Sequence, residues 1–131
     1  MGTADDAILA NKLGQLYQEI ATTLEDYLHA HAGDMEKQDR DLLGERVSGL
    51  LDFSDKFFSL SDRIAFAGSD TAFNGVTAAA QSAKEAIRHI AAVNKVINIT
   101  ADVITLAASI LTQNGAAVVE AVRSIIGDVK S

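Results

Sequence analysis

Residues 87–113 read IRHIAAVNKVINITADVITLAASILTQ and are apolar around most of the circumference of the helix that they would form. One row with heptad-like spacing contains Ile87, Ile90, Asn94, Ile97, Ala101, Ile104, Ala108 and Leu111. A second row beside it contains Val93, Val96, Thr100, Val103, Ala107 and Ile110. A helix that is apolar on nearly all sides is buried on most of them. This segment therefore predicts a helix at the centre of a helical bundle.

The rest of the chain favours helices as well, because its 131 residues include no proline, the residue that breaks helices most strongly. Apolar residues recur at three- and four-residue spacing, and glycines mark the breaks. A first helix is expected to start near Thr3 and end near His31. Asp34 is expected to cap a second helix, which stops at Gly68-Ser69-Asp70. The third helix starts at Ser69 or after Asn74 and runs to about Gln113. After a turn at Asn114-Gly115, a short fourth helix carries Val118, Val122, Ile125 and Val129.

These segments predict a single all-α domain over residues 1–131. We expect an up-down bundle of three long helices and a short C-terminal helix, with the third helix central. A competing interpretation concerns residues 93–105, which are rich in β-branched residues and alternate locally like a strand. Alanine-rich flanks favour the helix, with a weak point expected near Asn98–Thr100.

Composition restricts the function. The net charge is −7, and the acidic residues are concentrated before residue 71, so the chain lacks the basic surface that nucleic-acid binding requires. Without cysteine, the chain can form neither a disulfide framework nor a cysteine-based zinc site. The acidic start does not match a Sec-type signal peptide, so we expect a cytoplasmic protein or one exported by another route.

Three histidines and one aspartate are the candidates for chemistry. His29 and His31 lie near several acids, but a spacing of two places them on different helix faces, which does not suit a metal. His89, with Glu85 one turn earlier, could form a buried general base, although an exposed interface edge is the commoner situation. Asp102 lies in the middle of the apolar helix and either sets register against a partner or faces solvent on a narrow polar strip. We expect no catalytic residue, cofactor or metal.

Other features are expected to be structural. Phe53, Phe57 and Phe58, together with Phe66 and Phe73, are expected to form the large-residue layer of the core. Gly44 and Gly49 either permit a close helix approach or lower local stability.

The sequence thus predicts a non-enzymatic interaction module that buries an apolar helix face through self-association or against a protein partner. The partner-binding residues are expected to be Val93, Val96, Val103 and Ile110, from the second row. The alternative is a membrane-active bundle that conceals an apolar hairpin at residues 103–126, whose two arms flank the polar turn. The central Asp102 disfavours constitutive spanning, so contact with a membrane is the less favoured of the two.

Overall fold

The structure is a computed structural model that describes residues 4–59, 70–89, 92–112 and 114–130. All regular structure in these ranges is helical. The helices are α1 (Ala4–His31), α2 (Lys37–Ser59), α3 (Asp70–His89), α4 (Val93–Leu111) and α5 (Gly115–Lys130), and a 3₁₀ turn, Ala32–Asp34, follows α1. The all-helical prediction is confirmed. The expected count of four helices is wrong, because the described residues contain five α-helices.

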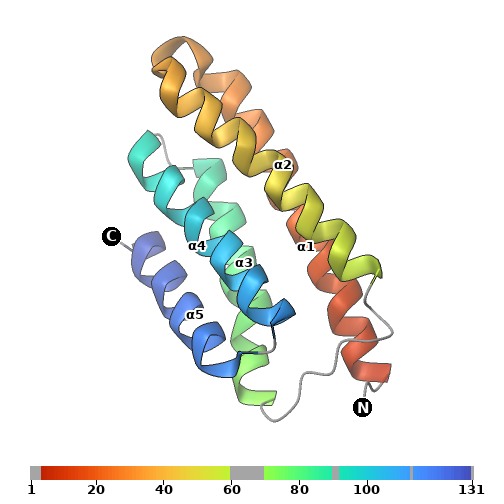
Figure 1. Ribbon diagram of the computed structural model, residues 1–131. Helices are drawn as coiled ribbons and strands as arrows, with labels where there is room; N and C mark the ends of the chain where they lie inside the picture. Colours follow the sequence, from red (N-terminus) through yellow and green to blue (C-terminus); the bar gives the residue numbers. More distant parts are fainter. Residues whose placement is uncertain (1–3, 60–69, 90–91, 113, 131) are drawn as a thin grey trace.

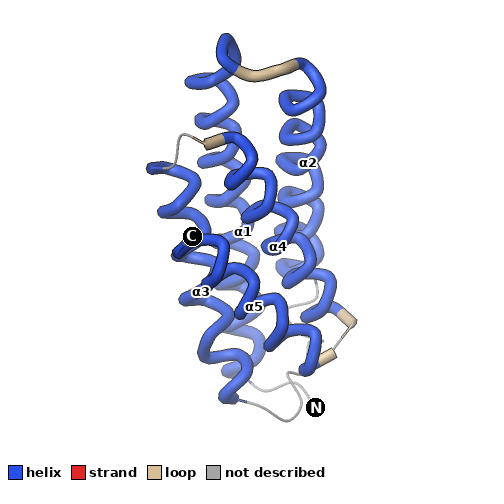
Figure 2. Tube along the Cα trace, turned by 90° about the vertical axis from the view of Figure 1, so that its left-hand side faces the viewer, coloured by secondary structure: helices blue, strands red, loops and turns tan. Residues whose placement is uncertain are grey.

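Successive helices run in alternating directions, and the long α1–α2 hairpin extends beyond the ends of α3 and α4 (Figure 1). The packing contacts close into a ring in the order α1, α2, α4, α5, α3. Figure 2 shows α5 lying along α4 on the side away from α2. The α4 helix also packs against α3 across the ring, and its Val103 carbonyl accepts a hydrogen bond from Tyr17 of α1. It therefore contacts every other helix.

The predicted long third helix is in fact two helices, α3 and α4. Ala92 immediately precedes α4 and has an extended backbone, with φ −75° and ψ 114°. Its carbonyl oxygen accepts bonds from the amides of Lys95 and Val96, each at 3.2 Å, which starts the new helix. The two helices lie side by side instead of forming one rod of ~55–65 Å.

The prediction that residues 93–105 form a helix and not a strand is confirmed, because they lie within α4. The weak point expected near Asn98–Thr100 is wrong, because the helix continues through it. Thr100 is fully buried, and its hydroxyl donates to Ile97 O at 3.0 Å. The helix interruption lies earlier, before Val93.

Most of the other predicted boundaries agree with the structure. The α1 helix ends at His31, α3 begins within one residue of the earlier predicted start, and α5 follows the Asn114-Gly115 turn. Asn114 Oδ1 accepts the amide of Ala117 at 3.1 Å and so caps α5. Asp34 does not cap α2, because it lies in the 3₁₀ turn and the extended Met35 follows it. The expected stop at Gly68 and Ser69 lies outside the described residues.

The core is built mainly from aliphatic side chains and alanine. Tyr17 and Phe57 are its largest members, with ring centroids 5.3 Å apart. Phe53 and Phe58 are half-buried rather than part of a central layer, and Phe66 and the Phe73 side chain lie outside what the structure describes. Four of the eight buried alanines, Ala79, Ala80, Ala83 and Ala86, lie on α3, where small side chains allow close packing against α1 and α5.

A close approach between α1 and α2 depends on Gly14. The Ser54 hydroxyl donates to Gly14 O at 2.6 Å, and the Phe58 ring covers the glycine. A Cβ at this position would lie 2.8 Å from ring carbons of Phe58. A close approach does not depend on Gly49, because a Cβ there would lie 3.7 Å from Ile104, an ordinary van der Waals contact, and Gly44 has nothing within 4 Å.

These surroundings predict opposite outcomes for two glycine substitutions. Gly44→Ala should stabilise the fold by about 0.5–1 kcal/mol, because alanine favours a helix interior and meets no obstacle. Gly14→Ala should be less stable than Gly44→Ala by about 1–2 kcal/mol, since the Phe58 ring must move. Urea denaturation of both variants measures the difference, and equal gains would contradict this account of Gly14.

The contact between α1 and α4 gives a second prediction. Tyr17 is fully buried, which raises the pKa of its hydroxyl, and the neutral phenol donates to Val103 O at 2.7 Å. Tyr17→Phe keeps the ring but loses this bond, so the free energy of unfolding should fall by about 0.5–1.5 kcal/mol. Thr22→Ala is the control, because the Thr22 hydroxyl is exposed and bonds only within its own helix. An equal loss in both variants would contradict the prediction.

Candidate functional site

The second row of α4, from which partner binding is predicted, faces inward in this structure. Val96 and Val103 are fully buried, Ile110 is 1 % exposed and Val93 is half-buried. The chain's own helices therefore cover most of this row. A partner could reach Val96, Val103 or Ile110 only if those helices parted, and their role in partner binding stays a prediction.

The first row of α4 lies nearer the surface. Ile97, Ile104 and Leu111 are half-buried and lie along the α2 side of the helix, where Ile104 approaches Gly49. Polar contacts also hold this side of α4 against α2. Arg46 of α2 donates to Ile97 O and to the Thr100 hydroxyl, both at 3.1 Å.

Of the three large apolar side chains that are exposed among the described residues, two lie on α5 and the third, Leu51, lies on α2. Val119 is 38 % exposed and Ile126 is 40 % exposed, and they lie two turns apart on the same face. Half-buried Val122 lies between them and contacts α3 beside Gly75. We call Val119, Val122 and Ile126 the α5 ridge. Of these residues, the sequence predicts only Val122 as part of the apolar row of the fourth helix, while Val119 and Ile126 fall within the hairpin of residues 103–126. Helical spacing alone does not show which apolar residues remain exposed.

Asp102 lies between α4 and α5 rather than on an open polar strip. Its carboxyl group is hydrogen-bonded to that of Asp128, near the end of α5, and its Oδ2 atom is buried without a hydrogen-bond partner. Loss of solvent, followed by the hydrogen bond and the negative charge of Asp128, raises the pKa of Asp102 to about 7.

The histidines do not converge on a site. His29 is exposed, and the ring of His31 stacks on that of Tyr27 with centroids 4.3 Å apart. His89 is exposed rather than buried, with Nε2 3.8 Å from Glu85 Oε2, which does not fit a buried general base. Within the described ranges, no group of three or more histidine and acidic side chains is placed to hold a metal ion.

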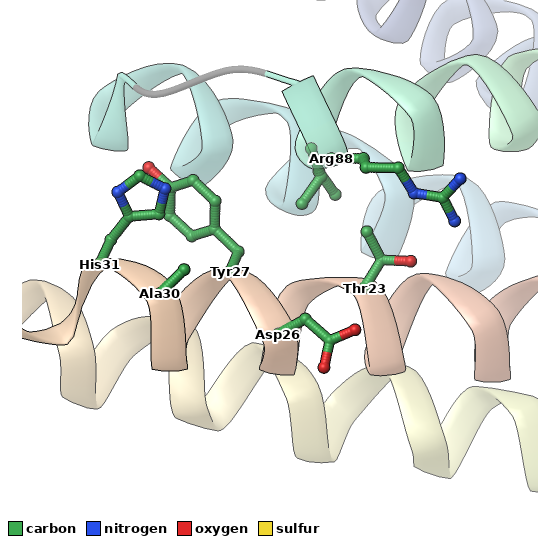
Figure 3. Close-up of a pocket in the computed structure, with 7 residues that line it drawn as sticks. Thr23, Asp26, Tyr27, Ala30, His31 and Arg88 are labelled. Carbon is green, nitrogen blue, oxygen red and sulfur yellow. The ribbon is translucent and has the colours of Figure 1, made fainter.

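A small cavity lies where α1 passes the end of α3. It measures about 210 Å³, and its lining residues are Thr23, Asp26, Tyr27, Ala30, His31, Ile87 and Arg88. Figure 3 shows the Tyr27 and His31 rings together at one end, while the charged ends of Asp26 and Arg88 point away from them. Pockets for small ligands usually measure about 300–1,000 Å³ and have polar groups that converge. This cavity does not match that description.

One helix among the described residues, α4, is long and apolar enough to cross a bilayer by length and composition. Of its most apolar 18 residues, 44 % are buried inside the protein. The central helix of a soluble bundle has the same properties. Length and hydropathy therefore do not distinguish a membrane-spanning helix from the central helix of a soluble bundle.

No protein-family model matches this chain, and neither a curated protein nor a solved structure is found to match it.

Proposed function

We propose that this chain is a non-enzymatic helical interaction module, which buries an apolar helix face by self-association or against a protein partner. The α5 ridge supports the proposal most directly, because two large aliphatic side chains, Val119 and Ile126, are about two-fifths exposed on one face. Exposed aliphatic residues that occur singly are normal, whereas aligned ones on one helix give a partner helix a continuous contact. We assign the contact to this ridge and not to the buried row of α4.

The surroundings of the ridge suit a protein contact. Glu120, Arg123 and Lys130 are exposed on the same helix, so an apolar strip is bordered by charges of both signs. Protein interfaces combine an apolar centre with a polar rim in this way.

A membrane-active bundle remains the second candidate, and the observation that favours it is α4 itself. This helix has the length and hydropathy to span a bilayer, and α5 covers one side of it. Exposure of the hairpin of residues 103–126 would then require a trigger.

For the interaction module, we predict a contrast between two kinds of lysine substitution. Val119→Lys with Ile126→Lys should leave the helical content unchanged and convert a self-associated wild type to a monomer, because these side chains are partly exposed. Val103→Lys should unfold the chain, since a fully buried, unpaired ammonium costs more than about 4 kcal/mol. Light scattering and circular dichroism measure both results.

Two outcomes would contradict the proposal. A wild type that stays monomeric to millimolar concentration rules out self-association, and cross-linking that recovers the same partners with the ridge variant rules out a ridge-bound partner. A folded Val103→Lys chain would show instead that the second row of α4 is accessible, as the sequence predicts.

The membrane alternative has its own test. A membrane-active bundle should float with liposomes and release a trapped dye under at least one condition of pH or lipid charge. We expect no release from liposomes at about pH 8, because Asp102, whose pKa is raised to about 7, is then mostly ionised at the centre of α4. Dye release that Ala108→Asp, at an exposed position of α4, abolishes without loss of helical content would favour the alternative.

A further inference from the structure

The large apolar side chains that are exposed among the described residues lie on two separate surfaces. Val119 and Ile126 belong to the α5 ridge, and Leu51 is 41 % exposed on α2. In the ring of packing contacts α2 and α5 are not neighbours, because α4 lies between them (Figure 2). One surface of a chain therefore cannot cover the other surface of the same chain.

Acidic side chains border Leu51. Asp55 follows it by four residues and so lies on the same face of α2, and Asp52 is the next residue in the sequence. Both aspartates are exposed. Lys56 lies about 140° around the helix from Leu51, and its Nζ atom is 5.2 Å from the centre of the Phe53 ring. We call Leu51, Asp52 and Asp55 the α2 patch, which combines an apolar centre with a negative edge.

The α5 ridge is bordered mainly by the opposite charge. Arg123 lies four residues after Val119 and three before Ile126, and Lys130 lies four residues after Ile126, so both cations share the face of the ridge. Both are exposed. The exposed Glu120 lies about 100° around the helix from Val119, at the edge of this face. The ridge is therefore an apolar strip with a positive border.

We propose that the α5 ridge of one copy packs against the α2 patch of a second copy, so that the chain associates with itself head to tail. This inference rests on the proposed interaction function and names its partner.

Charge complementarity favours this pairing over contact between like surfaces. Two α5 ridges placed together would bring Arg123 and Lys130 of both copies into one contact, with Glu120 at its edge. Two α2 patches placed together would collect four aspartates. Like charges across an interface cost free energy, whereas opposite charges steer association and fix the register. The α2 patch against the α5 ridge pairs two acids with two bases and places Leu51 on aliphatic side chains.

The whole chain has the same charge asymmetry. Residues 1–70 contain 14 acidic and six basic side chains, whereas residues 71–131 contain four acidic and five basic ones. The α2 patch belongs to the first part and the α5 ridge to the second. The field of each copy therefore attracts the C-terminal part of another copy toward its acidic part.

A head-to-tail contact uses two different surfaces of each copy. A pair of copies therefore leaves one α2 patch and one α5 ridge free, and further copies can add to both ends. The ion pairs lie at a solvent-exposed edge, so salt should weaken the association. The apolar centre is small, and we expect weak association that is visible at high protein concentration.

Charge reversal tests this contact in sedimentation velocity at low ionic strength. Arg123→Glu with Lys130→Glu gives a chain with two acidic surfaces, and Asp52→Lys with Asp55→Lys gives one with two basic surfaces. Each variant alone should associate at least about tenfold more weakly than a control with the same net charge. A mixture of the two should associate with a Kd within about threefold of the wild-type value, because a native α2 patch then meets a native α5 ridge.

The controls reverse the same number of charges at exposed positions outside both surfaces. Glu25→Lys with Glu36→Lys matches the α2 variant, and Lys37→Glu with Arg88→Glu matches the α5 variant. Each pair of substitutions changes the net charge of −7 by four, so every variant stays negative. Mixing the two test variants therefore adds no general attraction between oppositely charged proteins.

Two results overturn the head-to-tail contact and leave the proposed function standing. If reversal on α5 abolishes association while reversal on α2 matches its control, the chain associates ridge to ridge. If the wild type stays monomeric at millimolar concentration and low ionic strength, the cross-linking experiment decides whether the ridge binds a different protein. A mixture of the two variants that does not associate also overturns the contact.

Circular dichroism shows whether the variants keep the wild-type helical content. Should a reversal variant lose it, two neutral pairs replace both reversals, namely Asp52→Asn with Asp55→Asn and Arg123→Gln with Lys130→Gln. Each neutral pair should weaken association at least about threefold relative to the wild type, because it removes the charges from one side of the contact. Unchanged association in either neutral pair overturns the proposal.

Discussion

The burial of α4 by the four other helices is the contact on which the rest of the structure depends, because this helix has too much apolar surface to remain in water. The fully buried side chains of α4 include Val96, Ile99, Val103 and Leu106, which together line most of one side of the helix. The α1–α2 hairpin covers this helix from one direction and α3 with α5 from the other. No pair of helices could cover it alone, which accounts for the closed ring of packing contacts.

Apolar packing alone leaves the rotation of such a helix poorly defined, since nearly every face of α4 could point inward. Polar contacts resolve this ambiguity. Tyr17 bonds the carbonyl of Val103 from α1, and Arg46 bonds the carbonyl of Ile97 from α2. Asp102 meets Asp128 on a third side. A rotation of α4 by one residue would break all three contacts and leave buried polar groups unpaired, which is costly.

The sequence was sufficient to predict the helical class, the end of α1 and the start of α5, because local spacing and capping residues determine these features. It could not predict the reversal between α3 and α4, since residues 89–92 contain neither glycine nor proline and the apolar spacing continues across them. That reversal also changes which row of α4 faces inward. Two apolar rows of similar composition lie side by side, so the choice depends on where α1, α2 and α5 pack. The partner of Asp102 lies 26 residues later on another helix, beyond the reach of any local pattern.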